Sequence, residues 1–221
     1  GAPVAIAQQR HAFPFGTARE IYLGYGMGRA MRLTYVGELG WEIYIPTELA
    51  TTVYDALVEA GGDLGLRHAG YHALDSLRIE KAYRSWGHDI TSEDTPLEAG
   101  LGFAVALDKP GGFIGRDALL RQKEEPLRRR LLVFSLEDPE PLLFGDEPIY
   151  RDGELVGRIT SASYGHTIGR AAGLGYVTHP GGVAPAFIES GRWELDIACE
   201  RFPARASLRA PYDPRSLRVR T

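Results

Sequence analysis

The sequence predicts an α+β fold in which an antiparallel sheet with two main helices is followed by a small C-terminal β-barrel or jelly roll. Strand-like alternation and helix-like periodicity take turns up to about residue 122. From about residue 128, short strand patterns recur at near-regular spacing, and no helix of useful length is indicated. The charged stretch RQKEEPLRRR separates the two parts. We therefore predict one domain over residues 1–127 and a second over residues 128–221.

The first domain opens with a segment that has no clear period. Residues 1–25 contain prolines and glycines and predict loop with at most a short helical turn. Residues 30–35 and 41–45 then alternate like two strands around Gly37 and Gly40, which predicts a β-hairpin.

Two helices and one further strand follow the hairpin. Apolar residues recur at helical spacing from about residue 49 to 58, with Thr47 as a possible N-cap. A second helix is predicted from about residue 70 to 86. The apolar residues 101–107 predict a buried strand, and residues 116–122 a short helix.

The second domain shows strand patterns only. Asp152 and Gly153 stand between two apolar runs, which is a strong signal for a tight β-hairpin. The other predicted strands cover residues 131–136, 171–177, 193–198 and 202–208.

Composition limits the partners. Of the 221 residues, 44% are hydrophobic and 24% are charged, as in ordinary globular proteins. The net charge of −4 argues against a nucleic-acid partner, because such proteins usually carry a basic surface. No apolar run has the length of a membrane span, so no membrane partner is predicted. The single cysteine, Cys199, excludes a disulfide within the chain and favours a reducing compartment, predicted as the cytoplasm.

The hairpin LTYVGELGWEIYIP holds the most unusual polar residues. Alternation puts Glu42 on a face apart from Trp41, Ile43 and Ile45, which form the expected core face. A carboxylate there can accept two parallel hydrogen bonds from a planar donor pair such as a guanidinium or the amidine edge of a pterin or purine. The phenol of Tyr35 could cover or bind such a ring. Local physics leaves the plainer alternative of a solvated glutamate open.

Other candidates have plainer explanations. His88 and Asp89 could form a catalytic pair, but a histidine just past a helix end more often interacts with the helix C-terminus. Tyr83 and Trp86 would share one face of the predicted helix and serve as core or as a ligand platform. Cys199 lies in an alternating segment and is expected to be a half-buried strand residue.

Metal and phosphate motifs are missing from the sequence. The i, i+4 pair of His68 and His72 lacks the glutamate of HExxH and an obvious third ligand. The glycine-rich stretches match neither a dinucleotide fingerprint nor a P-loop. The residues alone therefore predict no catalytic group and no metal site.

Several longer motifs, taken in their order along the chain, resemble those of one family. This is the folate-binding aminomethyltransferase family founded by the glycine cleavage T-protein. Within it, the chain most resembles the C-terminal folate-binding module of dimethylglycine and sarcosine dehydrogenases. The resemblance covers nearly the whole chain. The motifs are AFPFGTARE, TYVGELGWEIYIP, LDSLRIEKAYRSWGHDI, TPLEAGLGFAV, FIGRDAL, GRITSASYGHTIGRAAGLGYV and APYDPRSLRVR.

The resemblance implies a tetrahydrofolate site. The family's pterin-binding Tyr and Glu, seven residues apart, fall on Tyr35 and Glu42. An aromatic residue of the folate channel falls on Phe103, and Tyr83 is similar to a channel aromatic of the dehydrogenase branch. A family Arg that contacts the folate tail falls on Leu74, so that contact is expected to be lost.

The resemblance also implies parts that this sequence does not contain. The family's catalytic Asp lies upstream of every motif quoted, and FAD belongs to a separate domain of the parent dehydrogenases. We therefore expect a fragment or one piece of a larger polypeptide, with an N-terminal part or a flavin domain as partner.

Three functions are open on this basis. The parent protein would transfer a one-carbon unit from an amine such as dimethylglycine, sarcosine or a glycine-derived aminomethyl group to tetrahydrofolate. The alternatives are a non-catalytic folate-binding or assembly module and a folate-dependent demethylase of the same family.

Overall fold

The structure, a computed structural model, describes residues 13–220, which fall into two compact units. The first comprises residues 13–74 with 215–220, and the second comprises Asp75–Pro214. Each unit is described by itself. The predicted boundary after residue 127 falls inside the second unit and stays a prediction.

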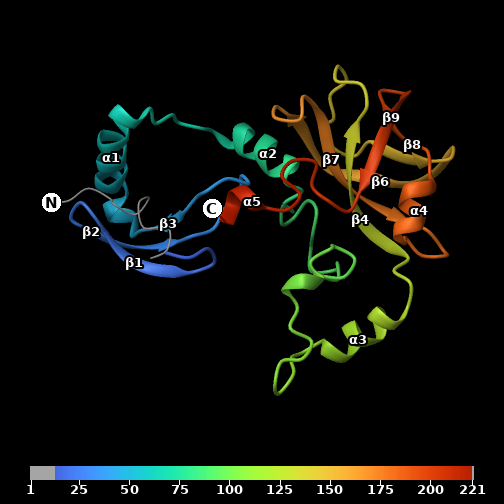
Figure 1. Cartoon of the computed structure of the whole chain (residues 1–221), viewed down its shortest axis with the longest axis horizontal. Helices are drawn as coiled ribbons and strands as arrows, with labels where there is room; N and C mark the ends of the chain where they lie inside the picture. Colours follow the sequence, from blue (N-terminus) through green and yellow to red (C-terminus); the bar gives the residue numbers. More distant parts are fainter. Residues whose placement is uncertain (1–12, 221) are drawn as a thin grey trace. The chain divides into compact units, whose positions relative to one another are not determined.

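The first unit is built on a three-stranded antiparallel sheet. Its strands β1 (Ala18–Leu23), β2 (Gly26–Met31) and β3 (Glu42–Tyr44) lie in the order β1-β2-β3 (Figure 1). A loop is predicted over residues 1–25, but residues 18–23 of that segment form strand β1, so the prediction is wrong there. Residues 1–12 of the predicted loop lie outside the described part. Pairing with β2 along the whole of β1 explains the strand, because backbone hydrogen bonds can order a segment whose residues show no clear alternation.

The predicted hairpin forms, but its first strand lies earlier in the chain and its second strand is shorter than expected. β2 ends at Met31 and β3 covers only Glu42–Tyr44, and the two strands pair antiparallel. Residues 32–41 form a loop between them. Tyr35 therefore lies in this loop and not on a strand beside Glu42, as the simple hairpin predicted.

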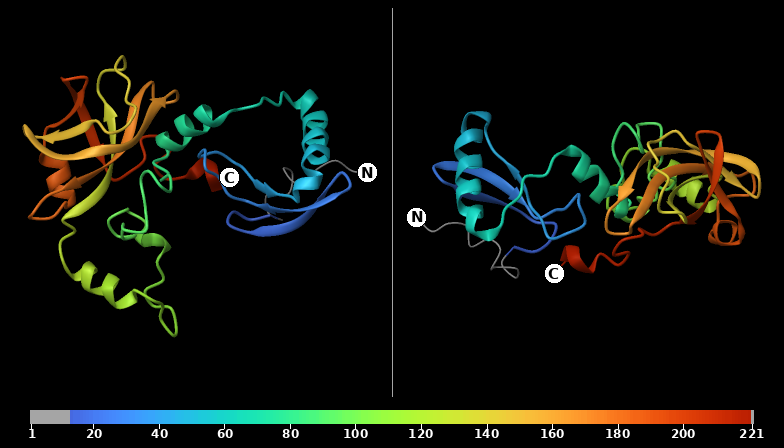
Figure 2. Two further views of the ribbon diagram at one scale, coloured as in Figure 1. Left: turned by 180° about the vertical axis from the view of Figure 1, so that it is seen from behind. Right: turned by 90° about the horizontal axis from the view of Figure 1, so that it is seen from above.

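One face of the sheet is covered by helix α1 (Ala50–Gly61), which follows the 3₁₀ turn η1 (Thr47–Leu49) and precedes η2 (Gly62–Leu64). Both views of Figure 2 show α1 beside the sheet. A Cβ atom added to Gly26 would lie only 3.2 Å from Leu49 Cδ1 and 3.3 Å from Val53 Cγ2. Helix and strand therefore pack in close contact. On the opposite face, Tyr22, Met27 and Tyr44 are exposed.

Helix α2 (Tyr71–Glu80) ends earlier than the predicted helix 70–86. Ala82 has a φ of 54°, which an α-helix cannot contain. The last helical residue, Glu80, is held by the backbone N–H groups of Thr167 and Ile168, which donate to its Oε1 at 2.6 and 2.9 Å. Tertiary hydrogen bonds thus favour a helix end where periodicity alone would continue.

The predicted buried strand at residues 101–107 is wrong. The segment contains a short 3₁₀ helix, η3 (Gly102–Ala104), closed by local hydrogen bonds such as Ala104 N to Leu101 O at 2.9 Å. An apolar run alone could not distinguish a strand from a short helical turn. The next prediction is confirmed, because α3 spans Arg116–Glu124.

The predicted β-barrel is confirmed as a closed six-stranded structure (Figure 1). Its strands follow one another in space as β4-β7-β6-β5-β8-β9, and β9 pairs with β4 to complete the circle. The strands are β4 (Arg129–Leu136), β5 (Pro148–Arg151), β6 (Glu154–Gly165), β7 (Arg170–Thr178), β8 (Trp193–Ile197) and β9 (Glu200–Ser207). Helix α4 (Pro185–Ser190) precedes β8, and α5 (Leu217–Arg220) belongs to the first unit.

Turn chemistry fixes two barrel hairpins. Asp152 and Gly153 join β5 and β6 with φ of 52° and 88°, as the Asp-Gly signal predicted. Ala198 and Cys199 join β8 and β9 with φ of 53° and 70°. Cys199 is therefore an exposed turn residue, and its predicted place as a half-buried strand residue is wrong.

The barrel interior is the main hydrophobic core. Leu132, Phe134 and Leu195 are fully buried there. Phe134 packs edge-on against Trp193 with ring centroids 5.6 Å apart. Within residues 13–220, no helix combines the length and the hydropathy needed to cross a bilayer.

We expect Leu195→Ala to lower the free energy of unfolding by about 2–5 kcal/mol, because it leaves a cavity in a core that cannot fully collapse. The matched control is Leu155→Ala in the same barrel, where the side chain is 63% exposed and the expected change is within about 0.5 kcal/mol. Urea unfolding followed by tryptophan fluorescence measures both. Equal losses would contradict the placement of the core.

Candidate functional site

The loop that carries Tyr35 is held in the first unit by backbone and side-chain hydrogen bonds. Arg32 N donates to Thr17 O at 2.9 Å, and Arg32 Nη1 donates to Phe13 O at 2.8 Å. Further along, the Oγ1 of Thr34 accepts the backbone N–H of Gly37 at 3.0 Å. Gly37 has a φ of 81°, a conformation that favours glycine. These contacts hold Tyr35 half-buried within a shaped loop.

Glu42 is the first residue of β3 and is half-buried. The phenol of Tyr44, two residues on and therefore on the same face, donates a hydrogen bond of 2.6 Å to Glu42 Oε2. This hydrogen bond and the Glu42 charge raise the pKa of Tyr44. Among residues 13–220, no group donates to Glu42 Oε1. One carboxylate oxygen is thus held, and the other is available.

The strand register determines what lies beside this pair. Met31 stands opposite Glu42, and Arg29 stands opposite Tyr44. Directly opposed residues share one face of a sheet, so all four side chains belong to the face away from α1. A cavity of about 530 Å³ lies on this face and is lined by Glu20, Met27, Gly28, Arg29, Met31, Tyr44 and Pro46.

Tyr83 lies in the second unit, just after α2 and not within it. Its backbone N–H donates to Arg78 O at 3.0 Å, and its carbonyl accepts Arg78 Nη1 at 3.3 Å. Burial raises the pKa of the Tyr83 phenol, and the charge of Asp213 raises it further. The predicted helix face shared with Trp86 does not exist, because both residues follow the end of α2.

Phe103 also belongs to the second unit, in η3, and 86% of it is exposed. Tyr35 and Glu42 lie in the first unit. Leu74, where the resemblance places a lost folate-tail contact, lies in α2 and is half-buried. The roles of these residues remain predictions.

Asp89 is a buried anchor and not half of a pair with His88. Its Oδ2 accepts hydrogen bonds from Arg78 Nη1 at 2.9 Å and from Ser85 N at 2.8 Å. Its Oδ1 accepts from Thr160 Oγ1 at 2.5 Å and from Ser161 Oγ at 2.6 Å. Both carboxylate oxygens are therefore occupied, while the neighbouring His88 is exposed.

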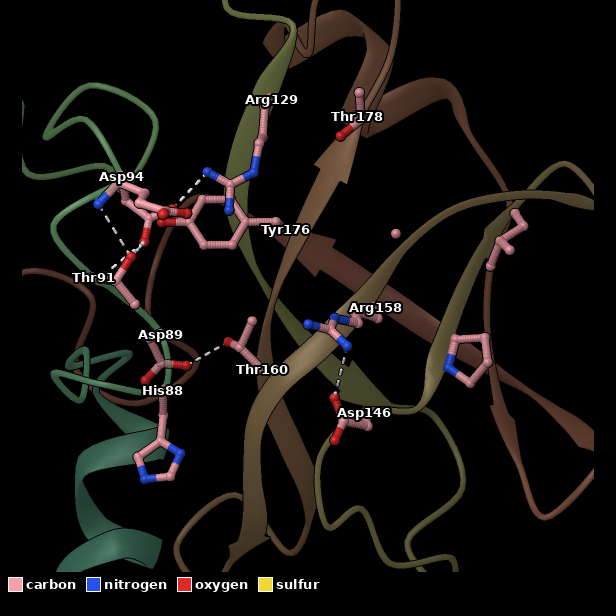
Figure 3. A pocket seen from close by; sticks show the side chains of 14 residues that line it. His88, Asp89, Thr91, Asp94, Arg129, Asp146, Arg158, Thr160, Tyr176 and Thr178 are labelled. Carbon is pink, nitrogen blue, oxygen red and sulfur yellow. Dashed lines mark hydrogen bonds and ion pairs between the residues drawn. The ribbon is translucent and has the colours of Figure 1, made fainter.

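A cavity of about 750 Å³ lies beside Asp89 on the second unit. Figure 3 shows Arg129 against Tyr176 on one side of it and Arg158 with Asp146 on another. The Arg129 guanidinium lies 3.6 Å from the centre of the Tyr176 ring and donates to Asp94 Oδ1 at 2.6 Å. Burial acts to raise the pKa of Asp94, but hydrogen bonds from Arg129 and Thr91 outweigh it and lower the pKa.

Tyr176 has an unusual hydroxyl group. It is buried and has no hydrogen-bond partner among the described residues. Burial, followed by the charge of Asp94, raises its pKa to about 12. The hydroxyl therefore stays protonated throughout the neutral range.

Sequence reasoning missed two features of these sites. Tyr44 could have been found, because its i+2 spacing from Glu42 puts both on one strand face. The anchoring of Asp89 could not, because Thr160 and Ser161 are more than 70 positions away along the chain.

Two family models match the sequence. Residues 4–109 match the GCVT N-terminal domain, and residues 129–213 match the glycine cleavage T-protein C-terminal barrel domain. Among solved structures, an aminomethyltransferase T of the glycine cleavage system from Bartonella henselae aligns with a TM-score of 0.71 at 23% identity. The alignment covers 83% of this chain and 49% of that chain and shows a shared fold.

Curated relatives include longer proteins. The chain is 44% identical over 219 residues to the formaldehyde-forming 4-methylaminobutanoate oxidase of Paenarthrobacter nicotinovorans, covering 99% of this chain and 26% of that protein. It is 44% identical over 211 residues to the mitochondrial sarcosine dehydrogenase of Homo sapiens, covering 95% of this chain and 23% of that protein. The chain thus spans about a quarter of the length of these relatives.

We expect Asp89→Asn to destabilise the protein by about 3 kcal/mol, because it removes the buried partner of the Arg78 charge and leaves only the half-exposed Asp75 to pair with it. Asp146→Asn serves as the control. Asp146 forms an ion pair with Arg158 in which the Asp146 side chain is 83% exposed and the Arg158 side chain 73% exposed. Loss of this pair should lower the free energy of unfolding by at most about 1 kcal/mol. Chemical denaturation at pH 7 compares them, and similar small losses would refute the anchor.

Tyr176→Phe should remove an alkaline loss of stability. Because the folded-state pKa of Tyr176 is raised from 10 to about 12, its contribution is complete below pH 10 and is lost as the pH rises toward 12. The free energy of unfolding of Tyr176→Phe should therefore fall less between pH 9 and 11 than that of the wild type. Tyr22→Phe, at a residue 78% exposed, should behave as the wild type does. Parallel curves for all three proteins would speak against the raised pKa.

Proposed function

Because the chain belongs to the glycine cleavage T-protein family, we propose that it binds tetrahydrofolate and that Glu42 recognises the pterin ring. The observation that carries the proposal is the Glu42 carboxylate, which has one oxygen fixed by Tyr44 and the other without a donor among the described residues. It lies on the sheet face that α1 leaves uncovered, with a cavity beside it.

The chemistry of the ring suits this carboxylate. A pterin presents a ring N–H and an exocyclic amino group side by side, and a carboxylate accepts both in a bidentate arrangement. The loop that holds Tyr35 begins beyond Met31, which is paired with Glu42, and ends at Trp41. This loop brings Tyr35 to the same end of the β2–β3 pair, where its phenol would close over the ring. Tyr83 and Phe103 are proposed as aromatic contacts of the same ligand.

The proposed reaction is transfer of a one-carbon unit from an N-methyl amine. The relatives are named for 4-methylaminobutanoate and for sarcosine, both N-methyl amino acids. Oxidation of such an amine by a two-electron acceptor gives a methylene iminium ion. Each folate nitrogen then loses its proton as it bonds to that carbon, the carbon–nitrogen bond to the amine breaks, and the demethylated amine takes up both protons and leaves as an ammonium ion. FAD is proposed as the acceptor and would be held by another domain of the parent protein.

A non-catalytic folate-binding module is the second candidate. Glu42 and Tyr44 would serve either function in the same way, because both functions need the ring to be held. A cytoplasmic location and the absence of a nucleic-acid partner stay predictions.

The test is calorimetric titration of the full chain with tetrahydrofolate. Glu42→Ala should weaken binding by at least about 100-fold, because it removes two hydrogen bonds to a charged group that contribute about 1.5–3 kcal/mol each. Glu48→Ala, which removes an exposed carboxylate from η1, should leave the affinity unchanged. Equal affinities of Glu42→Ala and the wild type would exclude this site.

A further inference from the structure

We propose that Tyr44 is a positioning residue that fixes the Glu42 carboxylate for its ligand. The proposal rests on the proposed function of Glu42 and adds a residue that the family resemblance did not indicate. Its basis is the hydrogen bond of 2.6 Å from the Tyr44 hydroxyl to Glu42 Oε2, made between residues i and i+2 of the same strand.

The bond restricts a motion that a glutamate would otherwise keep. The terminal torsion of a glutamate side chain is broad, so an unrestrained carboxylate samples many planes. Recognition of two parallel donors requires one plane, because both oxygens must meet the donors at once. A phenol that holds Oε2 selects that plane before the ligand arrives, which lowers the entropy cost of binding. Oε2 keeps a second lone pair for the ligand, and Oε1 keeps both.

The strand geometry makes the contact dependable. Cross-strand pairing of Met31 with Glu42 and of Arg29 with Tyr44 fixes both Cα positions and both side-chain directions. Tyr44 also lines the cavity on this face, whereas Glu42 does not. Tyr44 therefore contacts both the carboxylate and the cavity.

The contact makes little contribution to the stability of the fold. Tyr44 is 55% exposed, so burial does not force the phenol toward Glu42. Removal of an exposed hydroxyl usually changes the free energy of unfolding only slightly. Tyr44→Phe keeps the ring and its packing and deletes only the donor, so the variant should fold as the wild type does.

The first measurement tests the pair in solution without a ligand. The neighbouring carboxylate raises the pKa of Tyr44. Ionisation of the Tyr44 phenol is followed by absorbance near 295 nm, as the difference between the titration curves of the wild type and of Tyr44→Phe. The same difference is then measured between Glu42→Gln and the double variant Glu42→Gln/Tyr44→Phe. Without the Glu42 charge, the Tyr44 titration should lie at lower pH. An unchanged titration would show that the pair does not form and would overturn the proposal.

The second measurement is a double-mutant cycle on tetrahydrofolate affinity in the full chain. Tyr44→Phe should weaken binding by up to about tenfold, because the carboxylate must then be ordered when the ligand binds. In the Glu42→Gln background the same substitution should have almost no further effect, since Tyr44 acts through the carboxylate. Tyr22→Phe, on an exposed tyrosine of the same sheet face, is the matched control and should bind as the wild type does.

The outcomes separate this inference from the proposed function. Wild-type affinity in Tyr44→Phe, combined with a large loss in Glu42→Ala, would overturn the positioning role and leave the folate site intact. An equal loss from Tyr44→Phe in both backgrounds would show that Tyr44 contacts the ligand independently of Glu42, which also overturns it. Unchanged affinity in Glu42→Ala would instead exclude the folate site itself.

Discussion

The antiparallel register of β2 and β3 is the constraint on which the candidate site depends. Side chains alternate between the two faces of a strand, so a shift of one residue would turn Glu42 and Tyr44 toward α1. On the opposite face, α1 packs closely against Gly26, and Ala30, which stands opposite Ile43, is fully buried. That face is therefore apolar, and the observed register keeps the Glu42 charge away from it.

A different constraint orders the second unit. Arg78 and Asp89 are buried together, and each also bonds to the barrel or to the segment that follows α2. Removing two charges from water is unfavourable unless their hydrogen bonds are satisfied, so few arrangements of this segment are acceptable. Asp89 meets that requirement with four donors. The pair therefore specifies the path of the chain around Tyr83 more than it adds to stability.

The sequence predicted those features whose signals are local. The Asp152–Gly153 hairpin, the barrel and α3 depend on turn chemistry and short-range periodicity, and all three are confirmed. The predictions failed where the local structure depends on residues that are distant in the sequence. Helix α2 stops at Glu80, whose side chain bonds to backbone more than 80 positions away. Residues 101–107 pair with no strand of the described part of the chain and fold into local turns instead.

At the candidate site, too, the sequence predicted which face a residue lies on but not the contacts that its side chain makes. Alternation placed Glu42 on the face away from the core, but it could not show whether the carboxylate was solvated or held. The bond to Tyr44 answers that question, and it bears on what the site can contribute. A group that binds substrate and transition state equally does not accelerate a reaction, whereas holding two reactants in attack geometry can. In the proposed complex, a carboxylate fixed on a strand would define where the folate nitrogens stand. Its proposed contribution to one-carbon transfer is therefore position, and that contribution depends on how rigidly Glu42 is held.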